Sequence, residues 1–245
     1  MPRAARPSIE ARCHELLSFD RAFGAVPGPS ERPAKPSRPL CLVGFDEAGR
    51  GAWAGPVAVG CVHLPRALSD DDLVGLLAGV DDSKRLSPAA RARLFDRIAG
   101  CARYAVGFAC AAEIDRIGIV PACRCAAARA YRSLGISADV ALCDRGLTLE
   151  ADRSPQRGSS ALRRPPRTVE VTGGDGKSLH IAAASIVAKV SRDTWMGRLE
   201  RTWPGYDLAR HKGYGTKAHR NAILSQGISR LHRRTYLRGL REANL

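Results

Sequence analysis

Residues 41–51 have the sequence Cys-Leu-Val-Gly-Phe-Asp-Glu-Ala-Gly-Arg-Gly, an apolar run that ends in two acidic residues and a glycine-rich turn. The apolar part is typical of a short buried strand. A second run, residues 55–64, is rich in β-branched residues and predicts a strand that pairs with the first. The segment therefore predicts a sheet in which one strand ends in adjacent carboxylates.

The rest of the chain alternates segments typical of strands with segments typical of helices. Further strands are predicted at residues 104–110, 138–144 and 168–172. Helices are predicted at residues 87–101, 121–134, 178–203, 217–226 and 228–241, the first of them capped by Ser87 and started by Pro88. Strands and helices in this order predict an α/β layered domain with a partly antiparallel sheet.

The domain is expected to cover residues 39–245, with its C-terminal helices starting at about residue 206. Residues 1–38 contain scattered prolines and charges, which predict a disordered Pro/Arg-rich extension with at most a short helix near residues 9–23. Residues 145–168 are arginine-rich and predict a loop. The chain has no apolar run long enough to span a membrane and no apparent secretory signal, so we expect a cytoplasmic protein, acting as a monomer.

The charge of the chain points to a polyanionic partner. Its 39 basic and 24 acidic residues give a net charge of +15. Residues 189–245 hold 13 Lys or Arg and 4 Asp or Glu, so this segment contributes +9 of that total. Such a concentration favours salt-dependent binding of nucleic acid, although biased codon usage is an alternative explanation for 33 arginines against 6 lysines.

The eight cysteines are expected to be reduced, because a chain of this length does not need disulfides to fold. Cys123 and Cys125 form a C-x-C pair without a second pair or a flanking histidine, so the pattern does not favour zinc.

Acidic residues follow several of the predicted strands. Asp46 and Glu47 end the first, Asp144 ends the strand at 138–144, and Asp175 follows the strand at 168–172. Each alone would more often be a cap, a turn residue or an ion-pair partner. Strand ends are where α/β sheets build their sites, and hard oxygen ligands without Cys or His select Mg²⁺ or Mn²⁺. The set therefore suggests metal-assisted phosphodiester hydrolysis.

Five segments occur in the order seen in bacterial ribonuclease HII, a type 2 ribonuclease H. They are Gly44-Phe-Asp-Glu-Ala-Gly-Arg-Gly-Ala-Trp-Ala-Gly-Pro-Val57, Asp82-Ser-Lys-Arg-Leu-Ser87, Gly174-Asp-Gly-Lys-Ser178, Ala182-Ala-Ala-Ser-Ile-Val-Ala-Lys-Val-Ser-Arg-Asp193 and His211-Lys-Gly-Tyr-Gly-Thr216. The resemblance spans about residues 40–236. It implies a ribonuclease H-like mixed sheet flanked by helices, with a basic helical C-terminal segment and two Mg²⁺ or Mn²⁺ ions.

The activity that the resemblance implies is endonucleolytic hydrolysis of RNA in RNA–DNA hybrids. It extends to cleavage on the 5′ side of single ribonucleotides embedded in duplex DNA, leaving 3′-hydroxyl and 5′-phosphate ends. The family's four catalytic, metal-binding acids match Asp46, Glu47, Asp144 and Asp175.

The remaining family positions concern the nucleic acid. Gly49, Arg50 and Gly51 match a segment whose backbone contacts the 2′-hydroxyl of the ribonucleotide, which makes physical sense because glycine allows a close approach of backbone to ligand. Tyr214 matches a tyrosine that stacks on the sugar of the neighbouring deoxynucleotide. Lys84 and Lys189 resemble phosphate contacts.

Other charged residues near these positions have different predicted roles. Arg192 and Asp193 are expected to form an internal ion pair that steadies the long helix. The arginines of residues 228–241 recur at spacings of three to four, which predicts one helical face directed at phosphates.

The chain departs from the family pattern at two places. Asp144-Arg145-Gly146 stands where Asp-Gly-Asn is usual, and Gly173-Gly174-Asp175 stands where Lys-Gly-Asp is usual. Two alternatives to the hydrolase remain at this stage. One is a nucleic-acid-binding protein without catalysis, and the other is a ribonuclease H-like nuclease with a different substrate.

Overall fold

A five-stranded mixed sheet lies at the centre of the computed structural model, which describes residues 7–25, 40–149 and 165–242. The strand order is β3-β2-β1-β4-β5; β2 is antiparallel to β1 and β3, whereas β4 is parallel to β1 and β5. The strands are β1 (Leu42–Ala48), β2 (Val57–His63), β3 (Arg103–Ala109), β4 (Val140–Asp144) and β5 (Arg167–Val171). All five predicted strands are confirmed to within a few residues.

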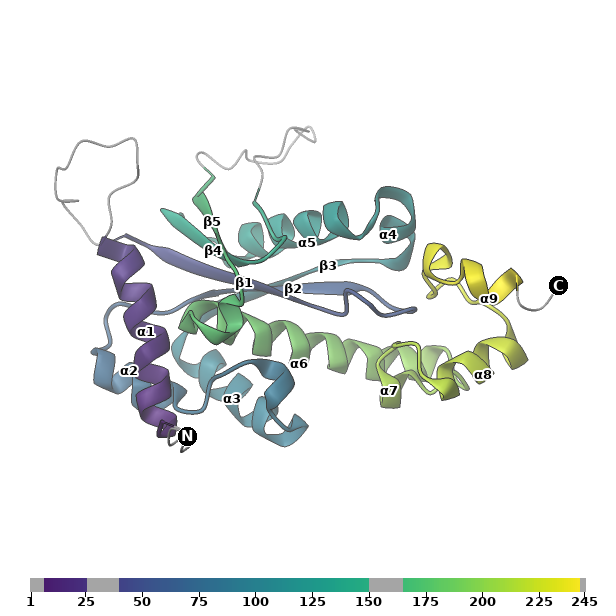
Figure 1. Ribbon diagram of the computed structural model, residues 1–245, viewed down its shortest axis with the longest axis horizontal. Coiled ribbons are helices and arrows are strands. Elements are labelled where there is room, and N and C mark those ends of the chain that lie inside the picture. Colours follow the sequence, from purple (N-terminus) through teal and green to yellow (C-terminus); the bar gives the residue numbers. More distant parts are fainter. Residues whose placement is uncertain (1–6, 26–39, 150–164, 243–245) are drawn as a thin grey trace, which may run out of the picture.

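Helices cover both faces of the sheet (Figure 1). One face packs against α5 (Ile119–Leu134), which follows the short helix α4 (Ala111–Ile117). The opposite face packs against α6 (Leu179–Thr202), with α1 (Ile9–Ala25), α2 (Asp70–Leu77) and α3 (Pro88–Cys101) outside it. Three 3₁₀ turns complete the sheet region and the C-terminal part: η1 (Ser83–Arg85), η2 (Gly174–Gly176) and η3 (Arg234–Tyr236).

The chain after α6 forms a smaller group of elements at one end of the molecule. These are α7 (Leu208–His211), α8 (Lys217–Gln226), η3 and α9 (Arg238–Glu242). Their own small core includes Met196, Leu208, Ile223 and Leu237. In the described part of the chain, no helix is long and apolar enough to cross a membrane. Free thiols are found, as predicted, at Cys13, Cys61, Cys101, Cys110, Cys123, Cys125 and Cys143.

Helix α6 lies unusually close to strands β1 and β2. A Cβ atom at Gly44 would lie 2.3 Å from the backbone carbon of His180, and one at Gly60 would lie 2.4 Å from the carbonyl oxygen of Ala184. The first half of α6 is correspondingly built from small residues, with Ala182, Ala183 and Ala184 fully buried. Small residues on both elements therefore allow the helix and the sheet to touch through their backbones.

The N-terminal part of the chain corrects the prediction of a disordered extension. Residues 9–25 form a 17-residue helix, α1, whose Cys13, Leu16 and Leu17 are buried against α2 and α6. Asp20 is also buried and accepts hydrogen bonds from the backbone N–H and the ring Nδ1 of His180, at 3.0 and 2.7 Å. The apolar residues have helical spacing, but their role depends on a partner surface supplied by distant segments. The rest of the predicted extension, residues 1–6 and 26–38, lies outside the described residues.

The helix predicted at residues 228–241 is wrong. His232 instead forms an isolated antiparallel bridge with Ala54, η3 follows, and only Arg238–Glu242 is helical. Asp115 of α4 accepts hydrogen bonds from the backbone N–H groups of Arg234 and Thr235, which ties this segment to α4. Tertiary contacts thus replace the hydrogen bonds that a helix would have made. Of the loop predicted at 145–168, residues 150–164 lie outside the described residues, and β5 begins at Arg167.

We predict that Gly60→Ala lowers the free energy of unfolding by about 1–3 kcal/mol or more, because the new methyl group would overlap the backbone of α6. Gly197 lies on α6 itself and has open space around its Cα. Gly197→Ala should therefore raise the free energy of unfolding by about 0.5–1 kcal/mol. Urea unfolding of both variants checks the pair. Equal effects of the two substitutions would contradict the close contact.

Candidate active site

The parallel pairing of β1 and β4 brings Asp46 and Asp144 to the same edge of the sheet. The register pairs Phe45 with Cys143, and Asp46 and Asp144 are the next residues on their strands. The two aspartates therefore lie at equivalent positions on neighbouring strands. Asp46 is only 5% exposed, and its Oδ1 accepts a hydrogen bond of 2.8 Å from the backbone N–H of Glu47. The sequence predicted strand-end carboxylates, and the sheet places two of them side by side.

Asp175 joins this pair through the η2 turn at the start of α6. Asp144 Oδ1 accepts a 2.9 Å hydrogen bond from the N–H of Gly174, which connects the end of β4 to that turn. Lys84 of η1 lies with its Nζ 3.8 Å from Asp175 Oδ2. Lys84, which the sequence predicts to contact a phosphate, therefore lies beside the acidic cluster.

Asp46 is buried, the other three acids are partly buried, and their negative charges repel one another. Burial, followed by the nearby charges of Glu47 and Asp144, raises the pKa of Asp46 well above its ordinary value. Burial also raises the pKa of Glu47, although its contact with Arg50 opposes this, and burial and Asp82 raise the pKa of Asp175. Burial alone would lower the pKa of Lys84, but the carboxylates of Asp175 and Asp46 hold it above the usual range. The cluster therefore has more negative charge than the neighbouring cations offset.

The donor set suits hard divalent cations. The cluster offers carboxylate oxygens, and the buried Oε2 of Glu47 has no hydrogen-bond partner among the described residues. A buried acceptor without a partner is costly, and a cation would satisfy it while relieving the repulsion between the acids. Among the residues that the structure describes, no three Asp, Glu, His or Cys side chains are already arranged around one point.

The segment Gly49-Arg50-Gly51 forms a turn directly after β1. Gly49 has φ +88°, and a Cβ atom there would overlap the guanidinium of Arg192, so this position needs glycine. The carbonyl oxygens of Gly49 and Arg50 accept hydrogen bonds of 2.8 Å from Arg233. Within the described chain, the amides of Arg50 and Gly51 donate to no group. The turn thus has its carbonyls held from behind and two amides available to a ligand.

Tyr214 lies on the other side of Arg192. Its ring is 36% exposed, with Lys189 Nζ at 5.8 Å and Arg192 Cζ at 5.5 Å from the ring centre. Lys189 also pairs with Asp193 at 2.9 Å. The structure therefore brings Tyr214 and Lys189 together, whereas Lys84 belongs to the acidic cluster.

The predicted ion pair between Arg192 and Asp193 is wrong. Arg192 is fully buried and donates to the carbonyl oxygens of Pro56 at 2.8 Å, Lys212 at 2.9 Å and Ala54 at 3.2 Å. Its role is nonetheless structural, because it connects α6 to the segment after the glycine turn.

Sequence reasoning missed Arg233 as the main support of this turn. Arg233 is fully buried, and besides Gly49 and Arg50 it binds the carbonyl oxygen of Gly55. The sequence carries no signal that distinguishes it from its neighbours, because it lies in a segment where most arginines are exposed. The prediction that this arginine faces phosphates is therefore corrected.

The departure at Arg145 leaves the carboxylate of Asp144 in place. Arg145 is exposed, and the turn closes through a 3.1 Å hydrogen bond from Leu147 N–H to the carbonyl oxygen of Asp144. Gly146 has φ +85°, so the glycine that this turn needs occupies the next position.

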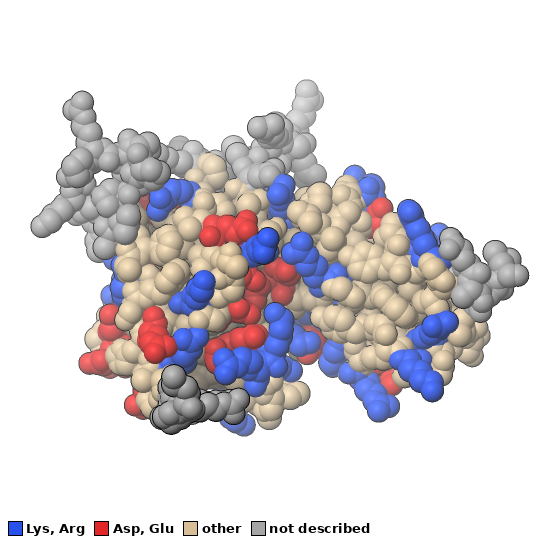
Figure 2. Space-filling view, in the orientation of Figure 1, with Lys and Arg blue, Asp and Glu red and all other residues tan. Residues whose placement is uncertain are grey.

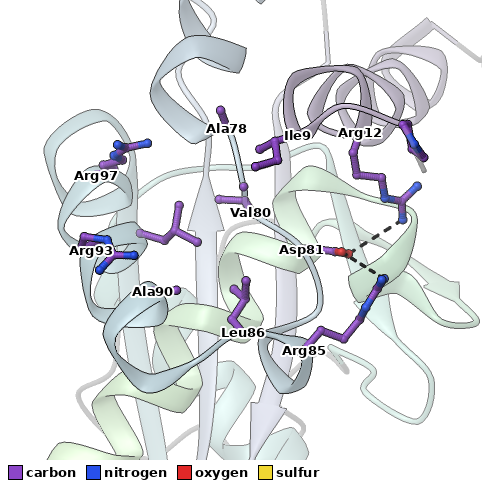
Figure 3. Close-up of a pocket in the computed structure, with 13 residues that line it drawn as sticks. Ile9, Arg12, Ala78, Val80, Asp81, Arg85, Leu86, Ala90, Arg93 and Arg97 are labelled. Carbon is purple, nitrogen blue, oxygen red and sulfur yellow. Dashed lines mark ion pairs between the residues drawn. The ribbon is translucent and has the colours of Figure 1, made fainter. Parts of the chain in front are cut away.

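Figure 2 shows Asp and Glu side chains gathered near the middle of one face, with Lys and Arg on both sides. A separate pocket of about 680 Å³ lies between α1, α3 and the segment that joins α2 to α3, and it contains none of the predicted site residues. In it Arg85 lies 3.0 Å and Arg12 lies 4.0 Å from Asp81, as drawn in Figure 3. Arg12 also donates to the carbonyl oxygen of Gly176, so α1 supports the turn that holds Asp175.

Comparisons with known proteins agree with this geometry. The sequence profile described as ribonuclease HII matches residues 43–238. A ribonuclease HII of Thermus thermophilus is 42% identical over 210 residues, covering 85% of this chain and 92% of the relative.

Two solved structures are also similar. That of ribonuclease H2 from Pyrococcus horikoshii has a TM-score of 0.60 and 26% identity, covering 83% of this chain and 98% of the other. A structure of Bst-RNase HIII in complex with Mn²⁺ shares the fold, with a TM-score of 0.56 and 18% identity, covering 86% of this chain and 74% of the other. The mixed sheet, the helices that flank it and the extent of the sequence match lead to one conclusion: the chain belongs to the ribonuclease HII family of nucleases, which act on RNA–DNA hybrids.

Proposed function

We propose that this ribonuclease H cuts on the 5′ side of single ribonucleotides embedded in duplex DNA, as well as within longer RNA–DNA hybrids. The products would carry 3′-hydroxyl and 5′-phosphate ends. The observation that carries the proposal is the arrangement of the acidic cluster (Asp46, Glu47, Asp144 and Asp175) next to the glycine turn at residues 49–51, with the exposed ring of Tyr214 beyond it.

The acidic cluster is proposed to hold two divalent cations, Mg²⁺ or Mn²⁺. When bound, these ions would activate a water molecule and stabilise the leaving oxygen. The protein's own contribution is to hold the carboxylates in a buried hollow in which their mutual repulsion favours cation binding. Lys84, which lies beside Asp175, can contact a phosphate of the cleaved strand.

The glycine turn and Tyr214 are proposed to recognise the junction between RNA and DNA. The two free amides of the turn can donate to a 2′-hydroxyl, which is the group that distinguishes a ribonucleotide. Tyr214 can stack on the next sugar, and Lys189 beside it can contact a phosphate. Action as a monomer in the cytoplasm stays a prediction from the sequence.

A duplex that contains one ribonucleotide and a matched all-DNA duplex test this function directly. Incubation with Mg²⁺ or Mn²⁺ should cut only the first substrate, on the 5′ side of the ribonucleotide. Products that end in a 2′,3′-cyclic phosphate would contradict the proposal, because they would identify the 2′-hydroxyl as the nucleophile.

We predict that Asp46→Asn and Asp144→Asn each reduce cleavage by at least the roughly 10- to 100-fold that follows loss of a partner of a metal ligand. Neither variant should be less stable to urea, because Asp46→Asn removes a buried charge that its neighbours repel. Asp96→Asn, at an exposed position on α3, is the matched control and should keep full activity. Near-full activity of either site variant in Mg²⁺ would remove that residue from the site.

We predict that Tyr214→Ala lowers cleavage at a single embedded ribonucleotide more than cleavage of a long hybrid, where many registers remain possible. The lost stacking corresponds to about 1–3 kcal/mol, and the metal requirement should not change. Tyr104→Ala is a matched control, since Tyr104 is 37% exposed but lies on β3 against Phe95. The ratio of kcat/KM on the two substrates is the measurement. A ratio equal to that of the unmodified protein would make Tyr214 a packing residue.

A further inference from the structure

Three histidines form a buried cluster directly behind Tyr214. His211 ends α7, His219 lies in the first turn of α8, and His232 forms the bridge to Ala54. They are 9%, 0% and 2% exposed. The rings of His211 and His219 stack with centres 4.3 Å apart, and those of His219 and His232 are 5.2 Å apart.

The contacts of His232 determine where its proton lies. Its Nδ1 is 3.1 Å from the backbone N–H of Ser229, which can only donate, so Nδ1 is the acceptor. A neutral His232 then carries its proton on Nε2. That nitrogen lies 3.1 Å from Nε2 of His219.

The proton position on His219 follows from this contact. Because His232 donates through Nε2, Nε2 of His219 must accept and its proton must be on Nδ1. Nδ1 of His219 lies 3.0 Å from the carbonyl oxygen of Tyr214 and donates to it. The hydrogen bonds therefore run in one direction, from Ser229 through His232 and His219 to the backbone of Tyr214.

His211 holds the backbone of Gly213, the residue before Tyr214. Its Nδ1 accepts from the N–H of Gly213 at 3.1 Å, so its Nε2 donates to the carbonyl oxygen of Tyr206 at 2.7 Å. Gly213 has φ +79°, and its carbonyl oxygen accepts from Trp53 and Ala54 of the segment after the glycine turn. Two imidazoles thus hold the backbone of residues 213 and 214 from behind.

Burial favours the neutral forms of His219 and His232. It lowers the pKa of His219 to about 4 and also lowers the pKa of His232. A second proton on His219 would place two N–H groups against each other at the 3.1 Å contact. The series of hydrogen bonds is therefore in its intact form at neutral pH.

The side chain of Tyr214 depends on this backbone support. In the described chain its hydroxyl group has no hydrogen-bond partner, and Lys189 and Arg192 flank the ring only at 5.8 and 5.5 Å. Its carbonyl oxygen, in contrast, accepts from His219 and from the N–H of Thr216 at 2.8 Å. The orientation of the ring is set mainly through the main chain.

We propose that His219 is a positioning residue for junction recognition: its Nδ1–H, directed by His232, fixes the carbonyl of Tyr214 and thereby the ring that stacks on the nucleic acid. This inference rests on the proposed role of Tyr214. It assigns His219 no contact with the substrate.

Two substitutions at His219 distinguish its hydrogen bond to Tyr214 from its hydrogen bond to His232. The amide of Asn in His219→Asn can occupy the place of Nδ1 and donate to Tyr214, whereas that of Gln in His219→Gln reaches the place of Nε2 and serves only His232. We expect His219→Gln to lower the selectivity ratio defined above for Tyr214→Ala by about two- to tenfold, the range for loss of one hydrogen bond. His219→Asn should retain the ratio. His63→Gln, which removes a Nδ1 contact to the carbonyl oxygen of Leu42 elsewhere in the fold, should also retain it.

The tautomers give a second measurement that needs no variant. Long-range ¹H–¹⁵N spectra of the imidazoles at neutral pH should show the proton on Nδ1 of His219 and on Nε2 of His211 and His232. A proton on Nε2 of His219 would overturn the inference, even if the variants did not fold.

The outcomes distinguish the inference from the function on which it rests. If Tyr214→Ala lowers the ratio but folded His219→Gln does not, the positioning role is wrong and the role of Tyr214 stands. If His219→Gln and His219→Asn lower the ratio equally, His219 acts through general packing and the positioning role is again wrong. If Tyr214→Ala has no effect, both proposals fail.

Discussion

Helix α6 lies so close to strands β1 and β2 that Gly44 and Gly60 have no space for a side chain. This contact determines where the first turn of the helix lies relative to the end of β1, and therefore where Asp175 lies relative to Asp46. Farther along, the same helix carries Arg192 into the segment that follows β1. The acidic cluster and the glycine turn are thus both positioned by one packed interface, in which rigid backbone contacts leave little freedom.

Two buried arginines, Arg192 and Arg233, connect this interface to the segment that follows β1. Burying a guanidinium is costly unless its donors are paired, and here the acceptors are the carbonyl oxygens of residues 49, 50, 54–56 and 212. Arg233 holds the carbonyls of Gly49 and Arg50, while the amides of Arg50 and Gly51 donate to no group within the described residues. The same donors also connect the C-terminal elements to the sheet, which explains why this basic segment is part of the fold.

The acidic cluster has the opposite electrostatic character. Its carboxylates raise one another's pKa values, and Glu47 retains a buried oxygen without a partner. An arrangement that opposes stability in this way is typical of a functional site, because the unfavourable interactions are relieved only when a ligand binds. Lys and Arg side chains lie on both sides of the acidic side chains in Figure 2. The net charge of +15 favours the approach of a polyanion.

The sequence by itself determined the strands, the helices α3, α5, α6 and α8, and the family, because strand patterns, helix patterns and motifs are local. It also predicted the four acids, whose residue types reflect the chemistry. It predicted α1 only as a possible short helix, because Leu16 and Leu17 gain stability only from the α2 and α6 surfaces that cover them. It predicted a helix at residues 228–241, where bonds to Ala54 and Asp115 redirect the backbone. Only the tertiary structure decided which arginine is buried and which histidine nitrogen carries a proton. Both depend on partners that are distant in the sequence and that no local pattern specifies.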